Sequence, residues 1–429
     1  MDPAIITLCV LAVAAFLFIT ELIPLAVTAM AACTALGILG VLPSKQVYAG
    51  LSNSTVVLFG GMFVIGAAMF KTGLAEAIGI AVVKKAGTNQ VPLMAAIMLV
   101  TIVLSSVSSN TGTVACLMPV VIGICQAAKI SQSRQLMPLA IAANVGGTIT
   151  MIGTPPNVIV TGALSAAGLP TFGFFEFAYI GIPLSIIILV YTLFIGRHFI
   201  PDKQAGEMDE EAVKAAAEEA GASGDSAPKS KTKMWISGII LLGVVACMAL
   251  GLKNLPLHTA AVTGAILCVI TGCLKEKEAY AGIDWVTIFL FAGMLSVATA
   301  MEKTGAGKLI ADTVVGSMGE HPNAVVLCAV LYLISNVLTQ FMSNTAAAAL
   351  LAPIGISIAQ SIGADPKPVL MAIGIAASMA FATPMATPPN TLVLGPGGFS
   401  FNDYAKVGVP MCLISLVASV IIIPIFWPF

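Results

Sequence analysis

The chain has 429 residues, of which 58% are hydrophobic and only 9% are charged, and its mean hydropathy is +1.02. A chain of this composition cannot cover a water-soluble surface with polar groups, so we expect it to lie in a lipid bilayer. Its net charge is −1 and the sequence offers no basic face, which argues against nucleic-acid binding. At about 20 apolar residues per crossing, the length allows roughly ten spans.

Hydrophobic runs predict the same series of elements twice along the chain. The first series has spans at about 3–21, 24–42 and 54–72, an amphipathic stretch, an apolar run at 91–129 interrupted in its middle, a span at 135–168 interrupted by Gly-Thr-Pro-Pro-Asn, and a span at 177–200. The second series has spans at 234–252, 256–274 and 284–302, an interrupted run at 322–361, an interrupted span at 366–399 and a span at 406–428. The elements thus predict two repeats.

The two halves also match in sequence. Residues 55–78, TVVLFGGMFVIGAAMFKTGLAEAI, align with residues 287–310, TIFLFAGMLSVATAMEKTGAGKLI, at an offset of 232. Ser109-Asn110-Thr111 recurs as Ser343-Asn344-Thr345, and Thr154-Pro155-Pro156-Asn157 recurs as Thr387-Pro388-Pro389-Asn390, at nearly the same offset. A single duplication explains this spacing better than chance does. We therefore assign residues 1–200 to a first repeat and 234–429 to a second, joined by a solvated linker at 201–233.

Each repeat crosses the membrane five times if the run around Ser-Asn-Thr is a re-entrant hairpin, and seven times if that run is two complete helices. Both counts are odd, so the second repeat is expected upside down relative to the first, as in many secondary transporters. With both termini outside, most lysine and arginine residues, among them Lys71, Arg134 and Lys203, fall in the cytoplasm, whereas Lys367 falls outside.

The predicted fold is therefore an all-α polytopic membrane protein with two inverted repeats, about ten transmembrane helices and two re-entrant hairpins. We expect it in the inner (plasma) membrane, with extracytoplasmic termini and a cytoplasmic linker.

Two polar breaks in each repeat are the candidate site. Unpaired backbone groups in hydrocarbon cost several kcal/mol each, so irregular backbone is expected only where it lines a cavity enclosed by protein. At the tip of a hairpin, the Asn and Thr side chains, free backbone N–H groups and the positive end of a helix dipole can together hold an anion. Two consecutive prolines force the second break to unwind at Gly153-Thr154 and at Ala386-Thr387. Unwinding frees carbonyl oxygens for a small cation and threonine hydroxyls for a substrate.

No lysine, arginine, aspartate or glutamate falls in these breaks. A bound anion would therefore be met by hydroxyls, amides and helix ends, and bound cations would have to balance its charge. The same absence argues against a proton antiporter, because proton relays through membranes use ionisable side chains. The sequence shows no nucleophile–base pair and no cluster of metal ligands, so we do not expect an enzyme. The cysteines occur singly in apolar runs and are expected to be free thiols.

At these motifs the sequence resembles the divalent anion/sodium symporter family, also called the INDY-type carriers, within the ion transporter superfamily. The resemblance covers nearly the full chain and rests on the paired Ser-Asn-Thr and Thr-Pro-Pro-Asn motifs in the right order. It implies a homodimer in which each protomer has a scaffold and a transport part that moves as an elevator. The scaffold would comprise residues 1–87 and 234–310, and the transport part residues 91–200 and 322–429.

The resemblance also implies individual site residues. The family's substrate contacts carry over onto Asn110, Thr111, Thr154, Asn344, Thr345, Thr387 and Pro388. Its first sodium site carries over onto Ser105, Asn110 and Gly153, and its second onto Thr339, Asn344 and Ala386. Thr339 stands where a serine would match Ser105, and its hydroxyl keeps the ligand oxygen. Sodium is the expected coupling ion, and no other cofactor is expected.

The leading hypothesis is sodium-coupled symport of a C4 dicarboxylate such as succinate, with one Asn-Thr tip for each carboxylate. The alternatives among carriers are a sodium-independent exchanger of dicarboxylates or 2-oxo acids, and a carrier of sulfate or another oxyanion. From a different class, the chain could be an anion channel or the membrane subunit of an ATP-driven pump, such as one that exports arsenite. The sequence has no P-loop, so any ATPase would be a separate chain.

Overall fold

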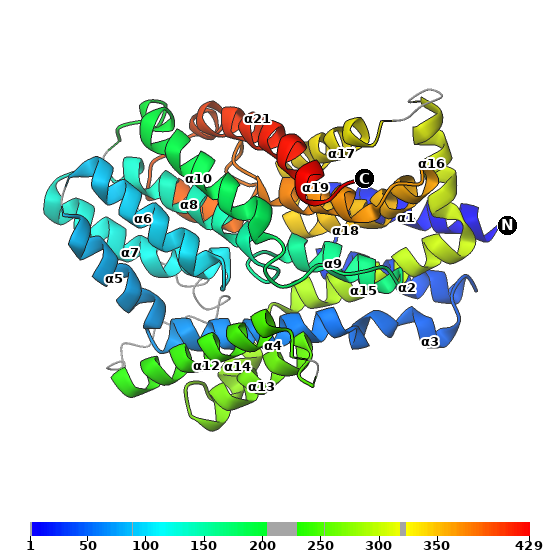
Figure 1. Ribbon diagram of the computed structural model, residues 1–429, viewed down its shortest axis with the longest axis horizontal. Coiled ribbons are helices and arrows are strands. Elements are labelled where there is room, and N and C mark those ends of the chain that lie inside the picture. The colour runs from blue at the N-terminus through cyan, green and yellow to red at the C-terminus, as the bar shows by residue number, and fades with distance from the viewer. Residues whose placement is uncertain (1, 88, 204–229, 253, 318–322) are drawn as a thin grey trace.

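The computed structural model describes residues 2–87, 89–203, 230–252, 254–317 and 323–429. Within these residues the regular structure is helical and contains no β-strand, as the sequence predicts (Figure 1). Most of the predicted linker, at 204–229, lies outside the described residues.

The first half follows the predicted series of elements. Its helices, in chain order, are α1 (Pro3–Thr20), α2 (Leu25–Ile38), α3 (Ser44–Val47), η1 (Ala49–Ser52), α4 (Ser54–Lys71), α5 (Leu74–Ala86), α6 (Gln90–Ser105), α7 (Asn110–Ala128), α8 (Ser133–Gly146), η2 (Gly147–Ile149), α9 (Pro155–Ala166), α10 (Ala178–Phe194) and η3 (Gly196–His198).

The second half repeats nearly the same order. Its described helices are α12 (Lys231–Leu250), α13 (Leu257–Ile270), α14 (Glu276–Ala281), α15 (Trp285–Thr304), α16 (Ala306–Ser317), α17 (Ala324–Thr339), α18 (Asn344–Ser361), α19 (Pro366–Ser378), α20 (Pro388–Leu394) and α21 (Phe401–Phe426). The interruptions fall where the polar motifs were noted, between α6 and α7, α8 and α9, α17 and α18, and α19 and α20.

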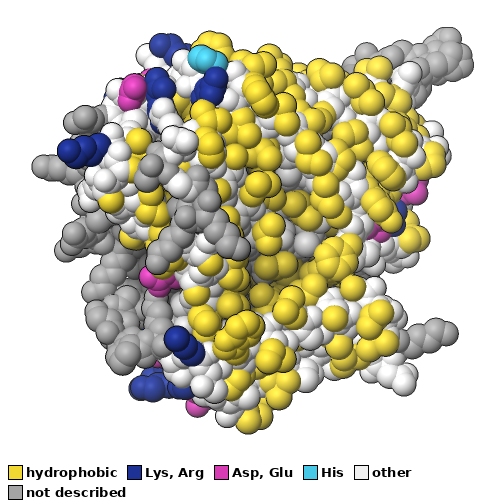
Figure 2. Space-filling model, turned by 60° about the vertical axis from the view of Figure 1, so that its left-hand side comes forward, with side chains coloured by type: hydrophobic (Ala, Val, Ile, Leu, Met, Phe, Trp, Pro, Cys, Tyr) yellow, Lys and Arg dark blue, Asp and Glu magenta, His cyan; other side chains and the backbone are white. Residues whose placement is uncertain are grey.

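The outer surface is apolar over wide areas. Leu22, Ile38 and Ile270 are each more than 70% exposed, and many other large apolar side chains are also uncovered. Figure 2 shows hydrophobic side chains spread over most of one face, with lysine and arginine gathered near its edge. Six helices among the described residues, α1, α4, α7, α12, α15 and α21, are long and apolar enough to cross a membrane. An apolar surface of this extent is stable in lipid and not in water.

The two halves interlock through close helix contacts. Helix α2 packs on α15, and α4 packs on α13, so each half supplies one helix to each contact (Figure 1). A Cβ atom added to Gly61 of α4 would lie 2.8 Å from the backbone carbon of Ala261, and one added to Gly293 of α15 would lie 2.7 Å from that of Ala29. The four residues correspond at an offset of 232. Small residues therefore allow both pairs of backbones to approach closely.

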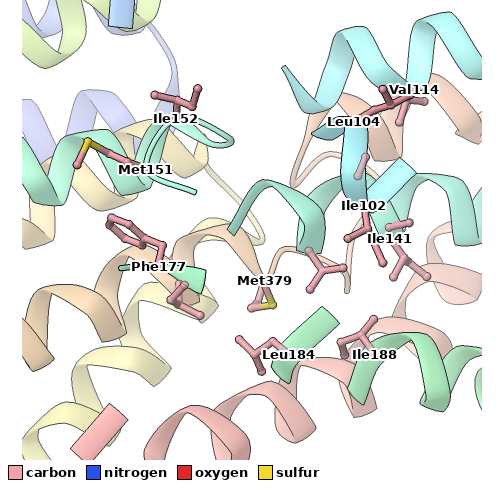
Figure 3. Packing of buried hydrophobic residues seen from close by; sticks show 14 of the residues in the cluster. Ile102, Leu104, Val114, Ile141, Met151, Ile152, Phe177, Leu184, Ile188 and Met379 are labelled. Atoms are coloured by element: carbon pink, nitrogen blue, oxygen red, sulfur yellow. The ribbon is translucent and has the colours of Figure 1, made fainter. Parts of the chain in front are cut away.

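The larger core lies among α6, α8, α10 and the helices around them. Ile102, Ile141, Leu184 and Ile188 are buried there together with Met379, which follows α19 (Figure 3). Residues of the broken helices α8 and α19 belong to this core.

The last helix of each half also contacts an interruption directly. A Cβ atom on Gly181 of α10 would lie 2.5 Å from the Thr148 carbonyl oxygen, and one on Gly408 of α21 would lie 2.1 Å from that of Phe381. Glycine at both positions lets α10 and α21 lie directly against the irregular segments.

Ion pairs occur at the ends of helices. Lys71 pairs with Glu278 at 3.3 Å and Arg134 with Asp202 at 3.4 Å. Burial raises the pKa of Glu278, but the Lys275 amide and the Lys71 ammonium outweigh this effect and lower the pKa overall.

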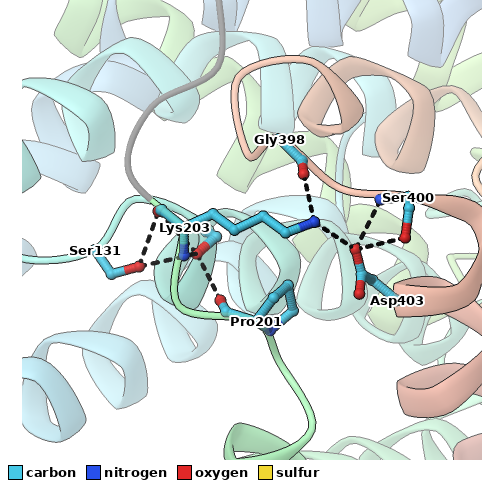
Figure 4. Close-up of polar contacts among 7 residues, drawn as sticks. Ser131, Pro201, Lys203, Gly398, Ser400 and Asp403 are labelled. Atoms are coloured by element: carbon cyan, nitrogen blue, oxygen red, sulfur yellow. Dashed lines mark hydrogen bonds and ion pairs between the residues drawn. The ribbon is translucent and has the colours of Figure 1, made fainter.

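Lys203 joins the end of the first half to the start of α21. Its ammonium lies 2.9 Å from Asp403 Oδ2 and donates to the Gly398 carbonyl oxygen at 2.9 Å, while Ser131 donates to the Lys203 carbonyl oxygen (Figure 4).

Glu176 forms another such junction. It pairs with Lys367 at 3.0 Å, and Trp427 donates its indole N–H to the same carboxylate oxygen at 2.6 Å. The side of the membrane on which these pairs lie stays a prediction.

The interlocking contacts lead to a test of stability. Replacing Gly61 or Gly293 by alanine puts a methyl group against backbone atoms, so we expect a loss of about 1 to 3 kcal/mol from overpacking. The apparent melting temperature of the purified protein in detergent, measured by size-exclusion chromatography after heating, should fall by several degrees. Gly243→Ala in α12 is the control, because a Cβ there meets no heavy atom within 4 Å. Equal melting of all three variants and the wild type would show that the close approach is not needed.

Candidate functional site

A cavity of about 670 Å³ lies where the two Ser-Asn-Thr turns and the two Thr-Pro-Pro segments meet. Apolar side chains of α4 and α15, such as Phe59, Met62 and Leu290, form part of its wall. All of the residues predicted to contact substrate line it: Asn110, Thr111, Thr154, Asn344, Thr345, Thr387 and Pro388. Residues separated by more than 200 positions in the chain are thus brought to one place.

Each Ser-Asn-Thr turn places a helix N-terminus at the cavity. Asn110 is the first residue of α7 and Asn344 is the first residue of α18, and the serine before each lines the cavity as well. Ser109 accepts a hydrogen bond from the Gly112 amide at 3.4 Å. The first amides of a helix lack partners within the helix and carry its positive dipole end. Two helix N-termini at one cavity favour an anionic ligand.

The asparagine of each Thr-Pro-Pro-Asn motif holds the unwound backbone. Asn157 donates to the Thr150 carbonyl oxygen at 2.8 Å, and Asn390 donates to that of Thr383 at 2.9 Å. Asn390 also donates to the Ala380 carbonyl oxygen at 2.9 Å. These bonds replace the helical hydrogen bonds that the interruption removes. The motif therefore breaks the helix with its prolines and stabilises the break with its asparagine.

The hydroxyl groups within the breaks tie them to the neighbouring turns. Thr150 donates to the Ser106 carbonyl oxygen, and Thr383 donates to that of Gln340 at 2.6 Å. Each broken helix is therefore fixed to the hairpin-like pair of helices of its own half.

A cluster of oxygen atoms lies at the predicted first sodium site. The Ser105 hydroxyl is 2.5 Å from Asn110 Oδ1 and 2.8 Å from the Ala143 carbonyl oxygen. Asn110 Oδ1 is also 3.1 Å from the carbonyl oxygens of Ala143 and Gly153. Four oxygens thus converge with a single proton among them. Either a cation between them or a rotation of the Asn110 amide, with its nitrogen donating to Ala143 and Gly153, satisfies the cluster.

The predicted second sodium site has the same local arrangement. The Thr339 hydroxyl is 2.6 Å from Asn344 Oδ1 and 2.7 Å from the Ala377 carbonyl oxygen. One hydroxyl proton cannot satisfy both acceptors fully. Ala386 is buried and lines the same cavity as Asn344. Both clusters are thus rich in the oxygen ligands that hard cations prefer.

A close backbone contact shapes the first cluster. A Cβ atom on Gly147 would lie 2.5 Å from Asn110 Oδ1 and 2.9 Å from the Gly153 carbonyl oxygen. Only glycine leaves room there for the oxygen atoms to converge.

The charge on the cavity wall is negative. None of its described lining residues is a lysine or an arginine, whereas Glu21 and Asp284 both line it. Asp284 caps α15 by accepting the Thr287 amide hydrogen at 3.0 Å. An anion in this cavity therefore gains no ion pair from the lining side chains, and its charge needs balance from elsewhere.

Some residues of the site were not anticipated from the sequence. The carbonyl groups of Ala143 and Ala377 join the oxygen clusters, but a backbone oxygen leaves no mark on residue type. Asn144 lines the cavity from α8, and its polar side chain inside a predicted span was the signal that could have found it. Glu21 and Asp284 lie at span ends, where an acidic residue is ordinary.

Known proteins match this chain along most of its length. The family model described as "Citrate transporter" matches residues 15–367 and 341–428. An uncharacterized transporter of Haemophilus influenzae is 31% identical over 442 residues, which cover 98% of this chain and 91% of that protein. The sodium-dependent dicarboxylate transporter SdcS of Staphylococcus saprophyticus is 26% identical, covering 95% of this chain and 83% of that protein.

A solved structure has the same fold. The YdaH transporter of Alcanivorax borkumensis superposes with a TM-score of 0.66 at 13% identity, covering 99% of this chain and 98% of that chain. The predicted resemblance is confirmed by these relatives: the chain belongs to the citrate transporter family of the ion transporter superfamily, and it is a membrane transporter and not an enzyme.

Proposed function

We propose that this protein is a sodium-coupled symporter of C4 dicarboxylates such as succinate. The observation that carries the proposal is one cavity that joins two helix N-termini with two oxygen clusters and has no lysine or arginine among its described lining residues. Each helix N-terminus offers amides and hydroxyls to one carboxylate. Two such termini suit a ligand with two carboxylates.

The electrostatics of the cavity support the proposed sodium coupling. A dianion shares this cavity with Glu21 and Asp284, and the described lining residues include no lysine or arginine, so cations that bind with it would add to the stabilisation from the two helix N-termini. Ser105, Asn110 and Gly153 would hold one sodium ion, and Thr339, Asn344 and Ala386 the other, with the Ala143 and Ala377 carbonyl groups alongside. The name of the relative SdcS, a sodium-dependent dicarboxylate transporter, supports the same coupling.

The proposed mechanism is an elevator motion of a transport part against a scaffold. The cavity wall is formed by α4 and α15 of the proposed scaffold on one side and by the turns and breaks of the proposed transport part on the other. The Asn110 amide lies 3.1 Å from the carbonyl oxygen of Gly153, in the break between α8 and α9. This contact places the turn between α6 and α7 beside that break, which supports a re-entrant hairpin for these two helices. The repeated order of helices supports two inverted repeats. A homodimer belongs to the same proposal.

The proposed orientation in the membrane implies the side toward which the cavity is open. With both termini outside and the linker in the cytoplasm, Glu21 at the end of α1 and Asp284 at the start of α15 lie on the cytoplasmic side. The cavity extends from the turns to these two residues. The structure would therefore be open toward the cytoplasm of a bacterial-type inner membrane.

The function is tested by uptake of radiolabelled succinate into proteoliposomes that contain the purified protein. We expect accumulation under an inward sodium gradient, none when choline replaces sodium, and competition by unlabelled dicarboxylates. Uptake in the absence of sodium that requires vesicles loaded with unlabelled dicarboxylate would instead identify the protein as a sodium-independent exchanger. Displacement by sulfate but not by dicarboxylates would replace it by an oxyanion carrier.

The two turns are tested by Thr111→Ala and Thr345→Ala. Each change removes a hydroxyl that would donate to a charged ligand, which costs about 1 to 3 kcal/mol. The succinate concentration for half-maximal uptake should therefore rise roughly 5- to 150-fold. Thr192→Ala is the control, because the Thr192 hydroxyl bonds to the Ile188 carbonyl oxygen within α10 and does not line the cavity. Wild-type uptake by both site variants would contradict the assignment.

The oxygen clusters are tested by Ser105→Ala and Thr339→Val. Both changes remove a hydroxyl oxygen from a proposed sodium site, and valine keeps the shape of threonine. We expect the sodium concentration for half-maximal uptake to rise at least several-fold, with partial recovery at high sodium. Ser105→Thr and Thr339→Ser keep the oxygen and are the matched controls. An unchanged sodium dependence in the first two variants would rule out these sites.

A further inference from the structure

Helix α9 of the first half is covered by α15 of the second. Gly162 of α9 lies under the ring of Phe291 in α15, and a Cβ atom on Gly162 would overlap the tip of that ring. Phe291 is 1% exposed, and Val158 and Ile159 of α9 are buried in the same core. The face of α9 that carries these three residues is therefore closed by an aromatic side chain of the other half.

The corresponding face of α20 is open. Thr391, Leu392 and Gly395 correspond, in that order, to these three residues of α9, at the offset of 233 that relates the two Thr-Pro-Pro-Asn motifs. Thr391 and Gly395 are exposed, and Leu392 is half-buried. Thr391 and Leu392 line the substrate cavity. Gly395 follows α20 with a right-handed helical backbone, so it continues the same face of the helix.

The aromatic side chain has an equivalent as well. Phe59 of α4 corresponds to Phe291 at an offset of 232, within the long matching segment of the two halves. Phe59 lines the cavity beside Phe63, with ring centroids 4.4 Å apart, whereas the described lining residues do not include Phe291. The cavity thus lies between α4 and α20, whose counterparts α15 and α9 are in contact.

We infer that the two phenylalanines take turns in closing the cavity during transport. Phe291 covers Gly162 in the state seen here. Phe59 covers Gly395 in the opposite state, in which Phe291 has left α9. Two repeats of opposite orientation exchange their contacts when they exchange conformations. This inference rests on the inverted repeats and the elevator motion of the proposed function, and it names the residues that close each side.

The two glycines provide a way to favour either state. The backbone is right-handed helical at Gly162, within α9, and at Gly395, so alanine fits both backbones. A methyl group on residue 162 overlaps the Phe291 ring only while that ring covers α9. A methyl group on the exposed residue 395 would overlap Phe59 only in the opposite state. Gly162→Ala should therefore oppose the present state, and Gly395→Ala should oppose the other.

The experiment measures which face of the cavity is open, with a cysteine introduced by Met385→Cys or by Ile152→Cys. These two positions correspond at the offset of 233 and both line the cavity, but Met385 is 62% exposed and Ile152 only 6%. Purified full-length protein in lipid nanodiscs is labelled with a polar maleimide, and the chain without the introduced thiol gives the background. We expect Gly162→Ala to slow labelling at position 385 and to speed it at position 152 several-fold. Gly395→Ala should have the reverse effect.

Rescue variants show whether the rings are responsible. Leucine lacks the tip of the phenylalanine ring, so adding Phe291→Leu to Gly162→Ala should restore both wild-type labelling rates. Phe59→Leu should do the same for Gly395→Ala. Failure of both rescues, unchanged rates in both alanine variants, or faster labelling at both positions, as a loosened fold would give, would each overturn the inference.

The labelling requires no substrate, so it separates this inference from the proposed function. Opposite shifts of the two labelling rates in a protein that takes up no succinate would support the inference and overturn the proposed substrate. Sodium-dependent succinate uptake without these shifts would support the proposed function and overturn the inference.

Discussion

The structure depends on providing hydrogen-bond partners for irregular backbone that is buried inside an apolar protein. Four interruptions lie inside the protein, where α8 and α19 are almost entirely buried, so their freed backbone groups need partners within the protein. Asn157 and Asn390 donate into the breaks, and Thr150 and Thr383 bond them to neighbouring turns. The same backbone groups that cannot be left unpaired are those that can meet a ligand. The site exists because the fold stabilises an otherwise costly arrangement in one enclosed place.

The positions of the breaks could be predicted because proline has a definite effect on a helix. α9 and α20 begin at Pro155 and Pro388, as the motifs indicate. The paired motifs, together with the family resemblance that they carry, also predicted side chains that line one cavity. The carbonyl groups of Ala143 and Ala377 could not be predicted, because any residue type supplies the same oxygen. Gly147 was missed for a related reason: its role is to be small beside Asn110, and its partner is known only from the packing.

The two halves have similar motifs and a similar order of helices, but they differ at single positions. Ser105 and Thr339 keep the same oxygen on slightly different side chains, so the two clusters remain alike. Asn144 of α8 and Ser378 of α19 occupy corresponding positions in the two halves but differ in their number of polar atoms. The two halves are therefore not alike at this position.

The contacts between α2 and α15 and between α4 and α13 have a consequence for synthesis of the protein. During translation the first half enters the membrane before its packing partners exist. The faces around Ala29 and Gly61 then meet lipid until Gly293 and Ala261 have been made and inserted. Neither half therefore completes its own core. The native state forms only after the second half of the chain has been synthesised and inserted. Two separately expressed halves would have to find each other in the bilayer before either became compact.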